Sequence, residues 1–350
     1  MLAISWIRQN LFSSWVNSII SVIIIYFLVS IIPPLLDWFI FEATFIANDR
    51  TGCTTDGACW AIIGARMYQF LYGFYPTEEV WRVNLVYALL PFGIVPLLWD
   101  GIPYRKQFLA FAVAYPFLVF FLLYGGVGLT SVASNKWGGL LLTLFLGLGG
   151  IIIAFPLSIF LALGRRSKMP AISAICIVFI EFIRGVPLIT LLFFGSMMLP
   201  LFLPEGLDID TVLRALVAVI IFQAAYGAEV VRGGLQAMPK GQYEAAQALG
   251  LSYWQMNIQI ILPQALKITI PALVNTAIGL FKDTSLVIVI GLLDLLGIGR
   301  AALADTKWMA LHVEVYVFIA VIFFIFCFGF SRYSLYLEKK LNTDNDSDNK

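Results

Sequence analysis

Charged side chains are scarce in this sequence, because Asp, Glu, Lys and Arg together make up only 12% of its 350 residues. Soluble domains carry about 25% charged residues, so this scarcity excludes an ordinary soluble globular protein. The net charge is +1 and no basic block occurs, which excludes the charge pattern typical of nucleic-acid binding. We therefore expect no nucleic-acid partner.

Reactive and metal-binding residue types are also few. His312 is the only histidine, and its place beside Glu314 at the end of a connection is typical of a surface residue. No histidine accompanies the closest cysteine pair, which argues against a zinc site. No nucleophile–base pair occurs, and the phosphate-binding pattern G-x-x-x-x-G-K-[ST] is missing. We therefore expect no catalytic residues, no metal, no cofactor bound by this chain and no ATP hydrolysis by the chain itself.

Long apolar runs are abundant instead. Hydrophobic residues make up 61% of the chain, and the mean hydropathy is +0.91. Several runs reach the roughly 20 residues with which a helix crosses the hydrocarbon core of a lipid bilayer. We predict an all-α polytopic membrane protein with about eight transmembrane helices. The predicted spans are residues 17–40, 84–99, 107–124, 138–163, 186–203, 211–231, 266–292 and 314–336.

The positive charges between the spans predict the orientation of the chain. Arg105 and Lys106 form one dense cluster, and a second lies at residues 165–168. Clusters in short connections favour the cytoplasmic side of the membrane. The sequence therefore predicts a multi-pass protein with its N- and C-termini in the cytoplasm.

Two polar segments lie outside these spans. Residues 41–83 form an external loop in this orientation, and Cys53 and Cys59 lie close enough within it to bridge if that compartment is oxidising. The alternative of two free thiols stays open. Cys176 and Cys327 lie in apolar runs and are expected to be small buried side chains. Residues 341–350 are polar and are predicted to be a disordered tail.

One apolar run is too long for a single crossing. Residues 171–200 would extend about 45 Å as one helix. Within EFIRGVPL, Gly185 weakens the helix and Pro187 removes a backbone donor. We predict an interfacial helix over 171–183 and a span over 186–203. Glu181 and Arg184, three residues apart, are expected to pair near the membrane surface as a structural or gating pair.

A mostly uncharged insert, GQYEAAQALGLSYWQMNIQIILPQ (241–264), interrupts the apolar runs of the second half. Good helix formers predict a helix over 242–251, with Gly241 before it and Gly250 placed to end it. Pro263 is expected to break the chain again. From the residues alone, an ordinary re-entry loop is favoured over a contact surface for another protein.

The insert resembles the cytoplasmic-loop signature of permease subunits of bacterial ABC importers, which is EAA, three residues, G, nine residues, I, one residue, LP. The matching positions are Glu244, Ala245, Ala246, Gly250, Ile260, Leu262 and Pro263. Residues 181–194, 224–252 and 275–297 resemble the polar amino-acid uptake branch of that family. The part before them, with CTTDGACW, GFYP and WRVNL, is similar to permeases of general L-amino-acid importers.

The resemblance implies a fold and a set of partners. Residues 135–340 would form a five-helix ABC type I importer permease core, and residues 1–134 an extension of three transmembrane helices. The loop 232–265 would dock on a separate ABC ATPase, present in two copies, which uses ATP–Mg. A second permease, homologous or identical, and a periplasmic amino-acid-binding protein would complete the complex. The implied function is import of general or polar L-amino acids across the bacterial inner membrane.

Polar residues inside predicted spans often mark a substrate pathway, because burying them in lipid is costly. Lys282 and Asp283, followed by Thr284 and Ser285, offer a cation, an anion and two hydroxyls. A zwitterionic amino acid needs a counter-charge for its carboxylate and another for its ammonium, so this group is a candidate substrate contact. The alternative is that Lys282 and Asp283 serve only packing between helices.

Three further polar residues belong to the region of the predicted span 211–231. Gln223 lies near its middle and is a second candidate for the pathway. Glu229 and Arg232, three residues apart near the cytoplasmic end, are expected to form a gate or a structural pair.

Two other functional classes compete with an ABC permease. An ion-gradient-driven secondary transporter of amino acids would show broken helices at corresponding positions of two halves. Breaks at residues 185–187 and 271 do not correspond in that way. A membrane enzyme or receptor-like scaffold has no reactive constellation to support it.

Overall fold

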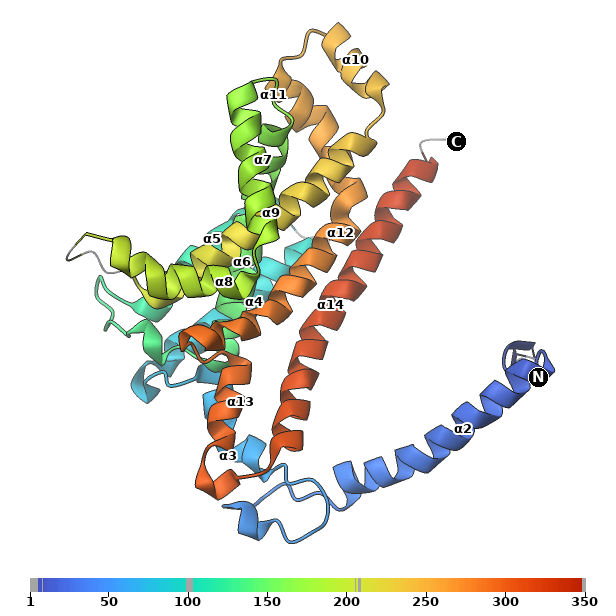
Figure 1. Ribbon diagram of the computed structural model, residues 1–350, viewed down its shortest axis with the longest axis vertical. Helices are drawn as coiled ribbons and strands as arrows, with labels where there is room; N and C mark the ends of the chain where they lie inside the picture. Colours follow the sequence, from blue (N-terminus) through green and yellow to red (C-terminus); the bar gives the residue numbers. More distant parts are fainter. Residues whose placement is uncertain (1–5, 8, 99–102, 205, 207–208, 348–350) are drawn as a thin grey trace. The chain divides into compact units, whose positions relative to one another are not determined.

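The computed structural model describes residues 6–7, 9–98, 103–204, 206 and 209–347 (Figure 1). Within these residues the regular structure is helical, with only three isolated β-bridges besides. Six described helical segments are long and apolar enough to cross a membrane, and a bent helix pair makes a seventh. The six are Trp15–Phe41, Arg105–Tyr124, Gly139–Arg165, Thr211–Ala237, Tyr253–Ile290 and His312–Lys340. The predicted all-α polytopic fold is confirmed, with α4 (Val80–Leu98) at the place of the remaining predicted span.

The chain divides into two compact units, Met1–Met67 with Ala302–Phe318, and Tyr68–Ala301 with Ile319–Lys350. The first unit contains α2 (Trp15–Leu36), which starts where the Ser14 side chain accepts a hydrogen bond from the backbone N–H of Asn17. Only Ser21 is buried among the residues of α2, so the helix is apolar and exposed on nearly all sides. A helix with this all-round hydrophobic character is typical of a membrane span.

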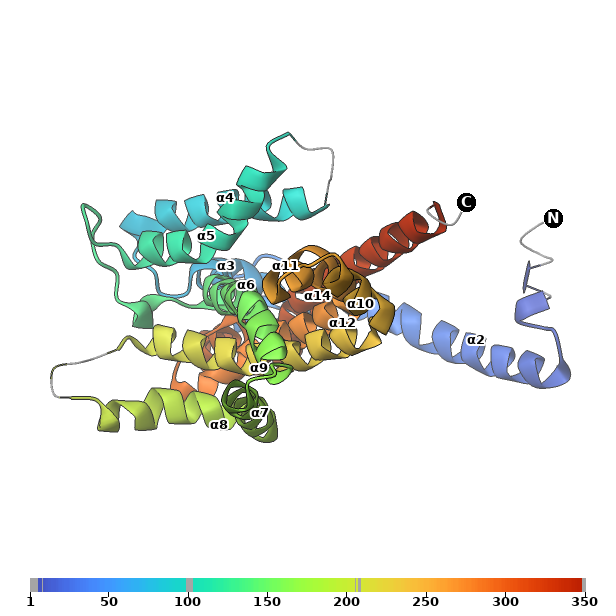
Figure 2. The same ribbon diagram turned by 90° about the horizontal axis from the view of Figure 1, so that it is seen from above.

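The second unit is built in layers around α6 (Gly139–Arg165) and α9 (Thr211–Ala237). The helices α4 and α5 (Arg105–Tyr124) lie on one side of them, and α7 (Pro170–Gly185) and α8 (Leu188–Phe193) lie on the other (Figure 2). Tyr115 and Val119 of α5 share one hydrophobic core with Phe145 of α6 and Val219 of α9. The sequence places α4 and α5 in an N-terminal extension, yet their side chains are part of this common core.

Glycines allow the central helices to approach closely. A Cβ atom added to Gly227 in α9 would lie 2.4 Å from the Ser158 hydroxyl oxygen of α6. One added to Gly234 would lie 2.6 Å from the carbonyl oxygen of Ala265 in α12 (Leu262–Asp283). Small residues of this kind bring helix backbones together in membrane bundles, where packing rather than water exclusion drives association. The helices α6, α9 and α12 are therefore held tightly together.

The predicted break before Pro187 is confirmed. The helix α7 ends at Gly185, Val186 is extended, and Pro187 is the residue that precedes α8. The path bends by 103° between the two helical segments Pro170–Gly185 and Leu188–Phe202. Pro187 disfavours a helical conformation in the residue before it, which explains why α7 ends where it does.

Pro263 does not break the chain, which corrects the prediction made from the sequence. Helical structure is continuous from α11 (Tyr253–Met256) through η7 (Asn257–Ile261) and α12 to η8 (Thr284–Ile290). The turn η7 is a π-helical turn, and Pro263 is the second residue of α12 directly after it. Pro263 therefore lies in the first turn of α12, where a missing backbone N–H is tolerated.

The last helix is longer than predicted. The helix α14 (His312–Ser347) includes residues 341–347 of the segment expected to be disordered, and residues 348–350 lie outside the described residues. The preceding residues Leu-Glu-Lys-Lys-Leu are good helix formers, so the helix propagates into the polar segment. Within the second unit, Phe323, Phe326 and Phe330 of α14 surround Phe281 of α12.

A buried carboxyl group caps α13 (Leu295–Leu303). Asp294 is completely buried, and its side chain accepts hydrogen bonds from the backbone N–H groups of Gly297 (2.9 Å) and Leu296 (3.3 Å). Thr143 of α6 accepts the N–H of Leu295 at 3.0 Å, so the first turn of α13 is tied to α6. Burial raises the pKa of the Asp294 carboxyl to about 6, although the two backbone donors act in the opposite direction.

Candidate functional site

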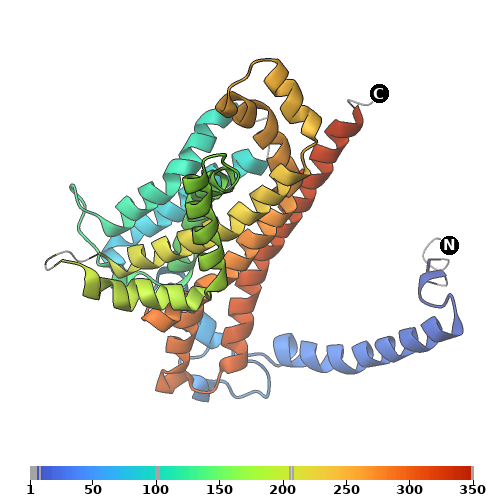
Figure 3. The ribbon, with the colours of Figure 1, turned by 45° about the horizontal axis from the view of Figure 1, so that its top comes forward.

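The segment that resembles the permease signature forms a separate short helix, α10 (Lys240–Ala248), after the end of α9. It lies with α11 at one end of the second unit (Figures 1 and 3). Glu244 and Ala245 are exposed, whereas Ala246 is 1% exposed and faces the bundle. Gly250 has a φ of +72°, the left-handed conformation in which glycine commonly ends a helix. The motif therefore presents its first two residues outward and anchors the helix through its third.

The segment after α10, which includes the remaining signature positions, packs back against the bundle. Ser252 and Gln255 form a capping box at the start of α11, where each side chain bonds the backbone N–H of the other residue. Ile260 and Leu262 are partly buried against a core cluster that includes Ala246 and Ile261. Pro263 is exposed. Only residues 238–252 lie between the long helices, so the connection is shorter than the predicted loop 232–265.

Gln223 has a polar partner inside the bundle. Its side chain is buried in α9, and its amide nitrogen donates to the Thr276 hydroxyl of α12 at 3.4 Å. Thr276 also donates to the carbonyl of Leu273 at 2.8 Å. The sequence analysis missed Thr276, because a threonine hydroxyl inside an apolar helix is usually satisfied by its own backbone.

Lys282 and Asp283 end α12, and Thr284 and Ser285 begin η8. Lys282 is exposed and Asp283 is partly buried. Thr284 is completely buried and donates to the carbonyl of Phe281 at 2.8 Å, and Ser285 donates to the carbonyl of Lys282 at 2.9 Å. Both hydroxyl protons are therefore used where the α-helix changes to a 3-10 helix.

The two candidate parts of the pathway do not form one cluster. Thr276, the partner of Gln223, lies two helical turns before Asp283, which corresponds to about 10 Å along the axis of α12. Any substrate contact by both parts would therefore be made at different depths of the bundle.

The predicted ion pairs join into one network around Glu229. Arg232 donates through Nε to the Glu229 carboxylate at 2.9 Å, so the predicted pair is present. Arg165 of α6 lies 3.2 Å from the same carboxylate, and Arg184 of α7 lies 4.0 Å from it. Three guanidinium groups from three helices thus share one carboxylate.

Glu181 pairs with Arg165 at 2.8 Å and not with Arg184, which corrects the predicted partner. Arg184 instead lies with its guanidinium carbon 5.5 Å from the centre of the Tyr226 ring. Spacing within α7 could not reveal this, because Arg165 reaches Glu181 from the end of α6. Arg165 is therefore a functional candidate that the sequence analysis missed, although it belongs to the positive cluster at residues 165–168.

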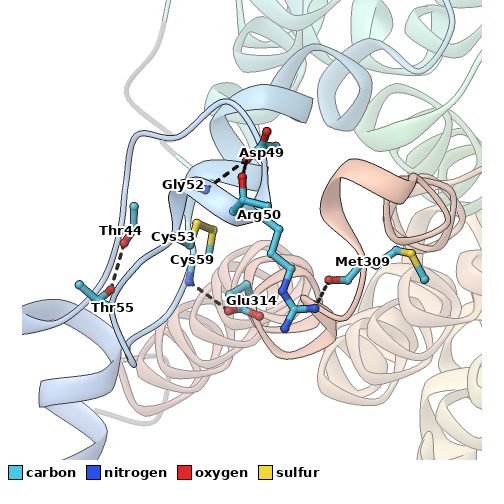
Figure 4. The surroundings of a disulfide bond; sticks show 10 residues. Thr44, Asp49, Arg50, Gly52, Cys53, Thr55, Cys59, Met309 and Glu314 are labelled. Carbon is cyan, nitrogen blue, oxygen red and sulfur yellow. Dashed lines mark hydrogen bonds between the residues drawn. A yellow bond between two sulfur atoms is a disulfide. The ribbon is translucent and has the colours of Figure 1, made fainter.

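Cys53 and Cys59 are joined by a disulfide in the first unit (Figure 4). The backbone N–H of Cys59 donates to the buried Glu314 carboxylate at 3.0 Å, and Arg50 donates to the carbonyl of Met309 at 2.5 Å. The cross-linked loop is thereby attached to the segment before and at the start of α14. His312, two residues before Glu314, is exposed, and its ring stacks near that of Tyr316.

Comparison with known proteins gives the chain a family. The family model described as "Binding-protein-dependent transport system inner membrane component" matches residues 154–343. The inner membrane amino-acid ABC transporter permease protein YhdY of Escherichia coli (strain K12) is 53% identical over 343 residues, which cover 97% of this chain and 94% of that protein. The glutamate/glutamine/aspartate/asparagine transport system permease protein BztC of Rhodobacter capsulatus is 39% identical, with coverage of 98% and 94%.

A crystal structure of an amino acid ABC transporter with histidines has a similar fold over part of this chain. One of its chains is 33% identical and superimposes with a TM-score of 0.51, covering 58% of this chain and 92% of that one. The sequence match extends over nearly the whole chain, and the matched solved chain covers a little more than half of it. The chain therefore belongs to the inner membrane components of binding-protein-dependent transport systems, and among them to the amino-acid ABC transporter permeases.

Proposed function

We propose that this chain is the transmembrane subunit of an ABC importer that moves amino acids into the cytoplasm, coupled through α10 to a separate ATPase. The proposal rests mainly on the structure and exposure of α10. It is a short, ordered helix held outside the bundle by a few inward contacts, with Glu244 and Ala245 exposed. A surface of small residues around one carboxylate suits close approach by another protein.

The ATPase would dock on the outward face of α10, one copy on each of two permease subunits. Gly241 lies in the first turn of the helix and Gly250 follows its end, and both are exposed. ATP–Mg would be bound and hydrolysed in the ATPase, and this chain would bind no cofactor itself. Movement of α10 with the ATPase would tilt the spans and expose the pathway alternately to each side of the membrane.

The family and the distribution of charge support the rest of the proposed assembly. The end of the second unit that carries α10 would lie in the cytoplasm together with both termini, as the positive cluster at residues 165–168 favours. A second permease, homologous or identical, would form the other wall of the pathway. A periplasmic amino-acid-binding protein would deliver substrate to the periplasmic face of the permease pair.

Two groups of polar residues would contact the substrate on its way. Gln223 with Thr276 offers an amide and a hydroxyl inside the bundle, and Lys282 with Asp283 offers two opposite charges at the end of α12. The network around Glu229 would serve as the gate, because it joins α6, α7 and α9 near the end that carries α10. The class of substrate would be general or polar L-amino acids.

Copurification tests the docking surface. The chain would be co-expressed with the ATPase, second permease and binding protein of the same organism. Ala245→Trp, which places a large side chain on the exposed face of α10, should abolish copurification of the ATPase. Ala301→Trp, at an exposed alanine of α13, is the matched control and should retain it. Normal copurification with Ala245→Trp would refute docking on this face.

Uptake into proteoliposomes tests the energy source and the pathway. Labelled amino acid should accumulate only with ATP on the side of the ATPase, and dissipation of proton and sodium gradients should not stop it. Uptake that persists without ATP and collapses with an ion gradient would establish the secondary-transporter alternative instead. Asp283→Asn and Lys282→Met should each lower uptake, and unchanged uptake and substrate-stimulated ATPase activity would exclude these residues from the pathway.

A further inference from the structure

The helix α10 is fastened to its own chain through its inward side. Ala246 is buried and Tyr243 is half-buried, and these two residues lie one helical turn apart. Both pack into the cluster that contains Leu235, Met256 and Ile261. Gln242 adds a hydrogen bond from Gln264 of α12 at 3.4 Å. Motion of α10 must therefore pass to the bundle largely through the side chains of this inward face.

Tyr243 makes the most specific of these contacts. Its hydroxyl donates to the carbonyl of Leu235 in the last turns of α9 at 3.0 Å. The same hydroxyl accepts a hydrogen bond from Nη1 of Arg166 at 3.1 Å. The guanidinium carbon of Arg166 also lies 5.6 Å from the centre of the Tyr243 ring, within the range of a cation–π interaction. One side chain thus joins α10 to the ends of two transmembrane helices.

Arg166 is covalently next to the charge network. It is the residue that ends α6, and its backbone N–H donates to the carbonyl of Leu163. Its neighbour Arg165 contacts Glu181 of α7 and Glu229 of α9. The two consecutive arginines therefore contact different partners, α10 on one hand and the network that joins α6, α7 and α9 on the other.

We propose that Tyr243 and Arg166 are positioning residues that transmit displacement of α10 to the Glu229 network. This inference rests on the proposed function, because it assumes that an ATPase moves α10. When α10 shifts, the hydroxyl and ring of Tyr243 carry Arg166 with them, and the end of α6 moves with its next residue, Arg165. The ion pairs that hold α6, α7 and α9 together then change in concert with the ATPase.

The test uses the assembled complex in lipid nanodiscs, with basal ATP hydrolysis, hydrolysis stimulated by loaded binding protein, and copurified ATPase measured together. Arg166→Ala should leave basal hydrolysis and the amount of ATPase unchanged while stimulation falls on the order of five-fold, the effect of losing one hydrogen bond. Arg166→Lys keeps the cation and should restore part of the stimulation. Lys168→Ala, an exposed cation in the same connection, is the matched control and should behave as the wild type.

Tyr243→Phe keeps the ring in its cluster and removes only the hydroxyl, so it tests the same link if Arg166→Ala fails to assemble. It should lower stimulation in the same direction. Wild-type stimulation in an assembled complex that carries either Tyr243→Phe or Arg166→Ala would overturn the proposal. A loss of assembled complex without a change in the ratio of stimulated to basal hydrolysis would overturn it as well, since that result indicates a structural role only. Failure of the proposed function is distinguishable, because the wild-type chain would then not copurify with the ATPase at all.

Discussion

A close approach of α9 to α12 provides a sharp test of how the bundle is packed. Gly233 and Gly234 are consecutive residues of α9, and only the second faces α12. A Cβ atom at Gly234 would lie 2.4 Å from Cγ2 of Thr269 and 2.6 Å from the carbonyl oxygen of Ala265. A Cβ atom at Gly233 would meet nothing within 4 Å. The variants Gly233→Ala and Gly234→Ala therefore differ only in whether the added methyl group contacts α12.

The magnitude follows from two effects of opposite sign. Each substitution favours the helix by roughly 0.5–1 kcal/mol, because alanine has less conformational freedom to lose than glycine. Ordinary carbon contacts lie at about 3.5–4.0 Å, so the alanine at residue 234 overlaps its neighbours by about 1 Å. Overpacking of this kind costs about 1–3 kcal/mol. Since the helix contribution cancels within the pair, Gly234→Ala should be less stable than Gly233→Ala by about 1–3 kcal/mol.

Thr269 cannot relieve the overlap by rotating. Its hydroxyl donates to the carbonyls of Ala265 and Leu266 at 3.2 and 3.1 Å, and one of the two clashing atoms is backbone. The melting midpoint of the purified protein in detergent should thus be roughly 2–6 °C lower for Gly234→Ala than for Gly233→Ala. Thr269→Ser, which removes Cγ2, should recover only part of the difference in the Gly234→Ala background. Equal midpoints for the two alanine variants would refute the packing described for α9 and α12.

Three further predictions concern charge, pH and the cross-link. Glu229→Gln should lower the free energy of unfolding by about 1–3 kcal/mol, because three arginines lose the carboxylate that they share. Thermal melting checks this, and Glu244→Gln, at an exposed carboxylate, should leave the melting midpoint unchanged. Asp294 has a pKa of about 6 in the folded chain, above its ordinary 3.8, so its ionisation lowers stability as pH rises from about 4 to about 6. Melting at pH 5 and pH 7.5 should therefore show the wild type more stable at pH 5 by about 1.4 kcal/mol, the value of one pKa unit, a difference that Asp294→Asn lacks. An equal pH response of both proteins would contradict this. Cys53→Ser should lower the free energy of unfolding of the cross-linked loop by about 2 kcal/mol and therefore speed tryptic cleavage after Arg50. Cys176→Ser, which removes a free thiol, should leave that cleavage rate unchanged.

The sequence predicted the features that depend on local composition. Apolar length located the spans, and Pro187 predicted the break after α7 because its restriction on Val186 acts within one residue. Pro263 was misleading for the converse reason. It lies in the first turn of α12, directly after a π-helical turn, where proline is tolerated, and nothing in the local sequence distinguishes that turn from an ordinary helix.

Contacts between distant residues could not be predicted in the same way. The spacing of Glu181 and Arg184 suggested a pair, yet Arg165 competes for Glu181 from another helix. The link between Tyr243 and Arg166 joins residues that are 77 positions apart. The seven-position resemblance identified α10 as a candidate site, but which side of it faces the bundle depends on the fold of α9 and α11 around it.

The division of α10 into an anchored and an outward side has a consequence for how such a protein can diversify. Its inward side is committed to Tyr243 and Ala246, and changes there disturb the bundle. Its outward side, with Glu244, Ala245 and Gln247, is not constrained by the packing of its own chain. Under the proposed docking on α10, exchanging these three outward residues would change which ATPase is recognised while the contacts to the bundle are kept. On the same proposal, a change confined to the outward side of α10 would let this permease be joined to an ATPase of different origin without altering its transmembrane helices.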